Sequence, residues 1–140
     1  TTAAQGTISF VVPLPPMGLR RNQQYRSGAA LKRLKDEYSE QVWCAGFLEI
    51  DKGRVSSDDR VGPWPKAHLR LTWRHHRMGP DEDNALASCK ALIDTLTTKG
   101  RRPLGIVADD TAKCLSIEIR TEKVRTKAEE GVHVLLRRIA

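Results

Sequence analysis

Apolar and polar residues alternate with a period of two in three stretches of the chain, which predicts half-buried β-strands. These stretches are residues 7–12, 66–77 and 113–120. The clearest is the second, where Leu69, Leu71 and Trp73 share one face and polar residues occupy the other. Prolines at positions 13, 15 and 16 end the first strand, because proline lacks an amide donor for a sheet. A fourth strand is expected near residues 132–139.

Two other segments have apolar residues at helical spacing. The first helix is expected from the N-cap Ser27 to about Leu48, with a buried side made of Leu31, Leu34, Tyr38, Val42, Ala45 and Leu48. The second begins near Asp83 and runs to about Thr97, with a core side made of Leu86, Cys89, Leu92, Ile93 and Leu96. Turn-forming residues predict a loop over residues 51–65 and a basic turn over residues 99–105.

The resulting order, β-α-β-α-β-β, predicts one α+β domain over residues 1–140. We expect a small mixed sheet of about four strands with two helices on one face. No apolar run approaches the roughly 18–20 residues that cross a bilayer, so no membrane association is expected. Three scattered cysteines without a CxxC pair indicate reduced thiols and a cytoplasmic location.

The formal net charge of +7 favours a polyanionic partner, because Lys and Arg that bind phosphates release condensed counterions. A basic surface without a nucleic-acid partner is the simpler alternative. Charge therefore makes nucleic acid a candidate partner without identifying it.

Three acidic residues are crowded into Asp81-Glu82-Asp83-Asn84, between a predicted strand and a predicted helix. Mutual repulsion makes such a cluster costly unless a cation compensates, and hard divalent ions such as Mg²⁺ prefer oxygen ligands. Helix capping is the commoner reason for an Asp at this place, and it needs only one of them. The motif by itself favours capping.

The helix that follows places Asp83, Ala87, Lys90 and Asp94 near one line of its surface, at 100° per residue. Asp83 and Lys90 would then project to the same side, about 10 Å apart along the axis. A solvated pair between Lys90 and Asp94 is the alternative.

A second acidic site, Asp109-Asp110, precedes the third strand. Neighbours in extended chain point to opposite sides, so one of the two would face a pocket shared with Asp81 and Asp83. An ordinary turn, for which Asp is well suited, competes with that interpretation.

Three blocks together resemble the RusA family of Holliday-junction resolvases, especially its phage and prophage members. The first is a short strand followed by Leu14-Pro15-Pro16 and a polar loop with Arg20, Arg21, Asn22 and Tyr25. The second is Asp81-x-Asp83-Asn84 opening a helix that continues through Lys90 and Asp94-Thr95-Leu96. The third is Asp109-Asp110 after a glycine-containing turn and before an alternating strand. Their order covers roughly residues 8–119.

The resemblance implies a homodimeric nuclease that cuts four-way DNA junctions with Mg²⁺, for which Mn²⁺ could substitute. The family's metal ligands correspond to Asp81, Asp83 and Asp110, with Asp109 as a less favoured substitute for the last. The family's catalytic lysine falls at Ala87 here, and Lys90, a turn further on, is the candidate replacement. Flanking phosphates would be bound by Arg20, Arg21, Asn22, Arg101 and Arg102, although each taken singly is as well explained as an ordinary exposed residue.

Two other functions remain open. A non-catalytic DNA-binding module would use the acids only as helix caps, and a nuclease with the same site could act on forks or flaps. An exposed Trp64 could stack on a base, although a core or loop anchor is the simpler role.

Overall fold

The computed structural model describes residues 6–20, 28–52, 62–98 and 102–139. Its main elements are β1 (Thr7–Val12), α1 (Gly28–Lys52), β2 (Ala67–His75), α2 (Glu82–Ser88), α3 (Lys90–Leu96), β3 (Leu115–Lys123) and β4 (Gly131–Arg138). Two short 3-10 helices, η2 (Met17–Leu19) and η4 (Lys127–Glu129), complete the set. The strand order is β1-β4-β2-β3, with β4 antiparallel to β1 and β2, and β3 parallel to β2. The expected four-stranded mixed α+β architecture is confirmed.

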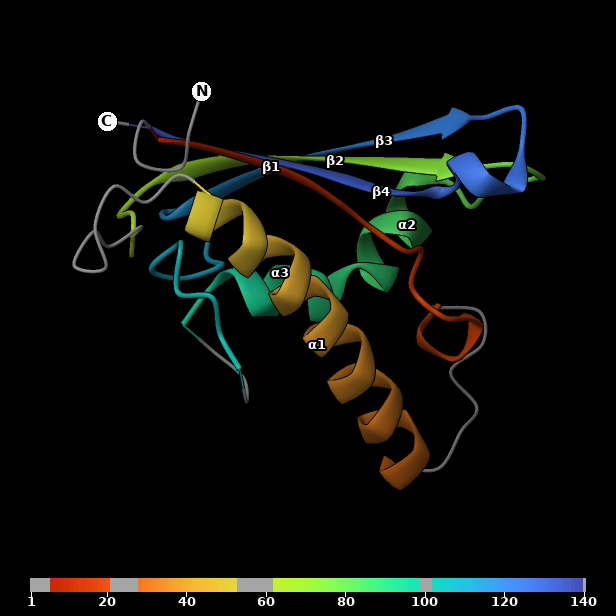
Figure 1. Ribbon diagram of the computed structural model, residues 1–140, viewed down its shortest axis with the longest axis horizontal. Helices are drawn as coiled ribbons and strands as arrows, with labels where there is room; N and C mark the ends of the chain where they lie inside the picture. Colours follow the sequence, from red (N-terminus) through yellow and green to blue (C-terminus); the bar gives the residue numbers. More distant parts are fainter. Residues whose placement is uncertain (1–5, 21–27, 53–61, 99–101, 140) are drawn as a thin grey trace.

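The three helices lie on one side of the sheet, and the core fills the space between the two layers (Figure 1). On β2, the predicted alternation is confirmed, because Leu69 and Leu71 are fully buried and Trp73 is 1% exposed. Its polar residues point to the opposite side, where no described helix covers the sheet (Figure 1). The fold therefore has one closed face and one open face. No helix in the described ranges has the length and apolar character needed to span a bilayer.

The first helix, α1, extends past its predicted end near Leu48, which is 60% exposed. Its fully buried residues recur every four positions instead, at Tyr38, Val42, Gly46 and Ile50. Gly46 permits a close approach of α1 to the segment between α3 and β3, because a Cβ there would lie 2.6 Å from Leu104 Cδ1. The predicted N-cap, Ser27, lies outside the described residues.

The second predicted helix is two helices, α2 and α3, that meet at Cys89 (φ −91°, ψ 9°) and run in different directions (Figure 1). The Ser88 hydroxyl donates a hydrogen bond of 2.8 Å to the carbonyl of Asn84. Such bonds to the preceding turn often bend helices. Apolar spacing does not detect this change of direction, since buried apolar residues lie on both sides of it, Ala85 in α2 and Leu92 in α3.

The segment before β2 runs beside the segment before β3. Trp64 forms a parallel bridge with Val107. The Trp64 N–H donates to the carbonyl of Ile106 (2.6 Å), and the Ala108 N–H donates to the carbonyl of Trp64 (3.1 Å). The β2-to-β3 connection is therefore a parallel crossover, in which α2 and α3 return the chain to the starting end of β2.

Candidate metal and nucleic-acid site

The acidic cluster forms the start of α2. Asp81 is the N-cap, and its Oδ1 accepts a hydrogen bond of 2.8 Å from the Asn84 N–H. Asp81, Glu82 and Asp83 are all exposed, and none forms an ion pair with a residue that the structure describes. The expected capping role of Asp81 is confirmed, while Glu82 and Asp83 add negative charge in the first turn, where the helix dipole favours it.

This cluster lies near the end of β2. Gly79, two residues before Asp81, is packed against the ring of His75, the last residue of β2: a Cβ on Gly79 would lie 2.5 Å from His75 Cδ2. The turn that carries Asp81 is therefore at the carboxyl end of the strand.

The second acidic site lies near the start of β2 and β3. Asp110 N–H donates to Asp109 Oδ1 (2.7 Å), and the amides of Cys114 and Leu115 both donate to the carbonyl of Thr111 (2.9 Å each). Ala67, the first residue of β2, donates its N–H to the carbonyl of Cys114 (2.8 Å). Asp109 and Asp110 thus belong to the turn that leads into β3.

The expected centre of Asp81, Asp83 and Asp110 does not form within one chain. The two acidic sites lie toward opposite ends of the nine-residue β2, whose ends are about 26 Å apart at 3.3 Å per residue. Asp109, the alternative third ligand, lies in the same turn as Asp110 and is therefore also at the opposite end of β2 from Asp81 and Asp83. Over the described residues, no group of three His, Cys, Asp or Glu side chains could hold a metal ion. The oxygen donors have the chemistry that Mg²⁺ prefers, but a single chain does not gather them.

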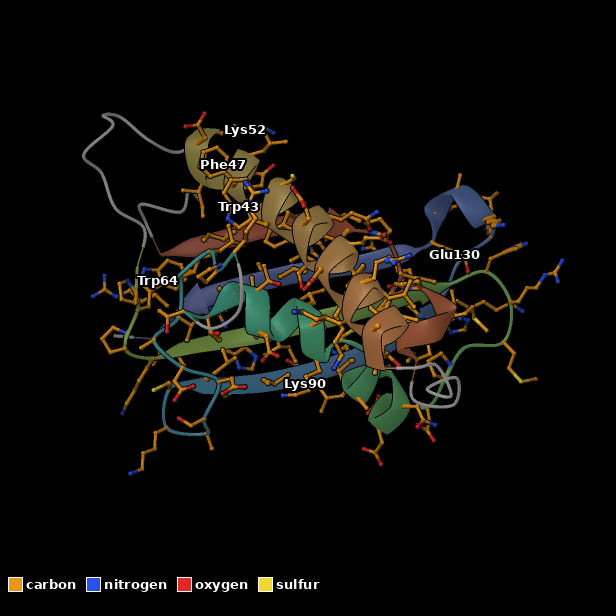
Figure 2. The ribbon with its side chains drawn as sticks, turned by 90° about the horizontal axis from the view of Figure 1, so that it is seen from below. Trp43, Phe47, Lys52, Trp64, Lys90 and Glu130 are labelled. Atoms are coloured by element: carbon orange, nitrogen blue, oxygen red, sulfur yellow. The ribbon has the colours of Figure 1, made fainter. Side chains whose placement is uncertain are left out.

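Lys90 begins α3, and its Nζ lies 3.8 Å from Asp94 Oδ1, with a side chain 74% exposed. This is the expected solvated pair on the helix surface. The projection that aligned Lys90 with Asp83 assumed one straight helix, and the change of direction at Cys89 removes its basis. Figure 2 shows Lys90 on the helical side of the sheet.

The two described arginines of the expected phosphate-binding set have partners in the chain. The Nε of Arg20 donates to the carbonyl of Pro15 (3.2 Å), and its guanidinium lies 5.5 Å from the centroid of the Trp73 ring. Arg102 pairs with Glu40 (Nη1 to Oε1, 2.5 Å). Arg20 is half-buried and so has a structural role. Three further members of the set, Arg21, Asn22 and Arg101, lie outside the described residues.

An aromatic stack on α1 was not anticipated from the sequence. The rings of Trp43 and Phe47 are nearly parallel, with their centroids 4.8 Å apart (Figure 2). The Cζ of Arg102 lies 4.2 Å from the centroid of the Trp43 ring. Two aromatic residues four positions apart in a helix are neighbours on its surface, which is the signal that could have identified it. Trp64, the expected candidate for base stacking, is only 4% exposed and is a core anchor.

A network of charges on the open face of the sheet was also not anticipated. Glu118 accepts hydrogen bonds from Arg120 (2.9 Å) and Arg70 (3.2 Å), and it lies 3.4 Å from His68. These bonds, from Arg120 above all, lower the pKa of the Glu118 carboxyl. Burial, assisted by the charge of Arg74, lowers the pKa of His133 on the same face. Pairing across strands sets this network, and strand order cannot be read from the sequence.

Comparisons with models of known protein families and with curated proteins found no match to this chain. The functional assignment therefore depends on the residues themselves and on the resemblance that they suggest.

Proposed function

We propose that the protein is an endodeoxyribonuclease that cuts branched DNA, four-way junctions in particular, by hydrolysing phosphodiester bonds. The observation that carries the proposal is the exposed start of α2, where Asp81, Glu82 and Asp83 follow one another without a described ion-pair partner. Capping accounts for one carboxylate of the three. Glu82 and Asp83 are therefore available to bind a cation or to contact the substrate.

Two further features support the proposal. The elements occur in the order that the resemblance implies, with the acidic turn after β2 and the second acidic turn before β3. The net charge of +7 suits a partner with a phosphate backbone. Branched DNA, a homodimer and a reducing cytoplasmic compartment remain parts of the proposal; the three cysteines are free thiols, which suits such a compartment.

Mg²⁺ is the proposed cofactor, because carboxylate oxygens are its preferred ligands. Asp81 and Asp83 are the residues proposed to contact it. Asp110 does not join them within one chain, so we assign no catalytic step to the ion.

The Asp81→Asn substitution separates catalysis from folding. Asn caps helices about as well as Asp, so the substitution removes the charge and keeps the cap. We expect cleavage of a labelled four-way junction in Mg²⁺ to fall by at least about a hundredfold, the scale of losing a group that stabilises the transition state. Junction affinity, measured by gel shift, should be unchanged or stronger, because negative charge is removed from a phosphate-facing site.

Asp83→Asn should behave in the same way, and Asp51→Asn, at an exposed acid near the end of α1, is the matched control. Cleavage that persists in both variants of the α2 acids would refute the proposed site. The substrate is identified by comparing the cleavage rates of fork, flap and linear duplex with that of the junction. If duplex is cut as fast as the junction, the protein is a nuclease but not a resolvase.

A second candidate function is a non-catalytic DNA-binding module. The cap formed by Asp81 and the surface pair of Lys90 with Asp94 favour it, because both residues then have ordinary structural roles. It predicts binding to DNA without Mg²⁺-dependent cutting of any of the four substrates.

A further inference from the structure

Ser116, His68 and Glu118 form a chain of contacts on the open face of the sheet (Figure 1). His68 is the second residue of β2 and Ser116 is the second residue of β3, and the parallel register pairs them directly. The Oγ of Ser116 lies 2.7 Å from His68 Nδ1, and His68 Nε2 lies 3.4 Å from Glu118 Oε2. A hydroxyl, an imidazole and a carboxylate in contact in this order are the groups that activate a serine nucleophile.

The direction of these hydrogen bonds follows from the charge of Glu118. Hydrogen bonds from Arg120 and Arg70 lower the pKa of its carboxyl, so Glu118 is ionised at neutral pH and can only accept. The proton of the neutral imidazole is then on Nε2 of His68, which leaves the lone pair of Nδ1 to accept from the Ser116 hydroxyl. In this tautomer His68 is a base for Ser116, and Glu118 holds the orientation of the ring.

A main-chain donor is available beside Ser116 because β3 is an edge strand of the sheet. The Ala67 N–H donates to the carbonyl of Cys114, so the even-numbered residues of this segment turn their main-chain groups toward β2. Main-chain groups alternate along a strand, so Ile117 turns its N–H outward, where no residue that the structure describes accepts from it. The N–H of the residue after a serine nucleophile commonly stabilises the oxyanion of acyl transfer.

Arg137 is a candidate binding group for an anionic substrate. It is the β4 residue that the antiparallel register pairs with His68, so the two side chains are neighbours on the open face. Arg137 is exposed and forms no ion pair within the described part of the chain. Arg70 and Arg120, in contrast, both pair with Glu118. A negatively charged group of a substrate would therefore be attracted to Arg137, next to the imidazole.

We propose that Ser116 is a nucleophile that hydrolyses small esters whose acyl group carries a carboxylate, which Arg137 binds. Ser116 Oγ attacks the ester carbonyl carbon while its proton passes to His68 Nδ1, and the Ile117 N–H stabilises the oxyanion. The ester bond then breaks, the leaving oxygen takes the proton from His68, and the acyl group stays on Ser116. Water attacks the acyl group in the same way, giving its proton to His68. The carboxylic acid is released as that proton returns to Ser116 Oγ. Glu118 is a positioning residue, because it contacts His68 and not the substrate.

A second serine and histidine pair on the same face provides an internal control. The exposed Ser9 has its Oγ 2.8 Å from His133 Nε2, but no carboxylate from the described residues contacts the other ring nitrogen. This pair has the hydroxyl and the imidazole without the orienting acid. Ser9 should therefore be a much weaker nucleophile than Ser116.

Labelling of the full chain with a fluorophosphonate tests the nucleophile directly, because the Oγ of an activated serine displaces fluoride and forms a stable ester with phosphorus. We expect labelling of Ser116 to be at least about tenfold faster than that of Ser9, the two sites being distinguished by peptide mass spectrometry. Ser116→Ala should abolish the rapid labelling and Ser9→Ala should retain it, with circular dichroism showing that both variants are folded. Equal labelling of the two serines, or none at Ser116, would overturn the proposal.

Hydrolysis of the mono-4-nitrophenyl ester of glutaric acid, followed by absorbance, measures the activity. Ser116→Ala should lower kcat/KM by at least about a hundredfold. Glu118→Gln should lower kcat and leave KM unchanged, since an orienting residue does not bind the substrate.

Arg137→Gln should raise KM by at least about threefold, whereas Arg125→Gln, the same change at an exposed arginine beyond the far end of β3, should not. A wild type no faster than Ser116→Ala, or a Glu118→Gln variant with unchanged kcat, would contradict the proposal. Because neither assay contains DNA or Mg²⁺, failure here leaves the nuclease proposal standing, and a protein that cuts no DNA leaves the esterase proposal standing.

Discussion

Two cysteines of this chain, Cys89 and Cys44, lie in contrasting environments, one buried and one exposed. Cys89 is fully buried where α2 meets α3, and burial raises the pKa of its thiol to about 12. Cys44 is on the exposed side of α1. The thiolate is the reactive form of cysteine, so these two thiols should differ widely in reactivity although both occur in helices.

We therefore expect a disulfide reagent at pH 8 to modify Cys44 rapidly in the native protein. Cys89 should react only after the protein unfolds, because the thiol is inaccessible and is almost fully protonated at that pH. Peptide mass spectrometry after timed quenching identifies the sites. Rapid native labelling of Cys89 would mean that the junction of α2 and α3 opens readily.

At the scale of elements, a close backbone contact joins the segments that precede β2 and β3. Gly62 has a φ of +84°, and a Cβ there would lie 2.5 Å from the carbonyl oxygen of Ile106 and 2.7 Å from that of Gly105. These are main-chain atoms that cannot move aside as a flexible side chain would. Glycine is required here both for its conformation and for the space, and the contact anchors the crossover that separates the two acidic turns.

Gly62→Ala should lower the free energy of unfolding by more than about 2 kcal/mol, since it combines left-handed backbone strain with a steric clash. Gly105→Ala is the matched control, because Gly105 also has a positive φ (+66°) but has open space at its Cβ position. We expect about 1 kcal/mol there, from conformation alone. Urea denaturation measures both, and equal losses would show that the clash at Gly62 is relieved without cost.

At the scale of the whole molecule, a net positive charge is combined with a local acidic cluster. The net charge is +7, yet Asp81, Glu82 and Asp83 stand together at one helix start. A phosphate backbone attracted by the overall charge would meet local repulsion at this cluster. The proposed association with DNA and the proposed chemistry at the cluster would therefore be separable in experiments.

Affinity for a four-way junction should fall at least about tenfold between 50 and 200 mM salt, since as few as two neutralised phosphates give that slope. Fluorescence anisotropy without Mg²⁺ measures it, with Asp83→Asn in parallel to show whether the slope is independent of the acidic cluster. An affinity that does not change with salt would mean that the net charge does not guide binding.

The sequence by itself determined the strands, the positions of the helical segments and the inward face of β2. The alternation of apolar and polar residues specified the ends of β1 and the inward side of β2, because the apolar side chains of a strand must all point into the same core. It also placed Asp81 at a helix start, because capping is a local interaction between residues close in the chain. The split of the second helix was missed, since apolar spacing is similar on both sides of Cys89.

Only the tertiary structure decided which distant residues meet. Strand order made β2 and β3 parallel neighbours, and a parallel crossover sends the end of one strand and the start of the next to opposite ends of the sheet. Asp110 is separated from Asp81 and Asp83 for that reason. The network around Glu118 and the free edge of β3 likewise follow from strand pairing, which depends on the packing of the whole core and leaves no local signal in the sequence.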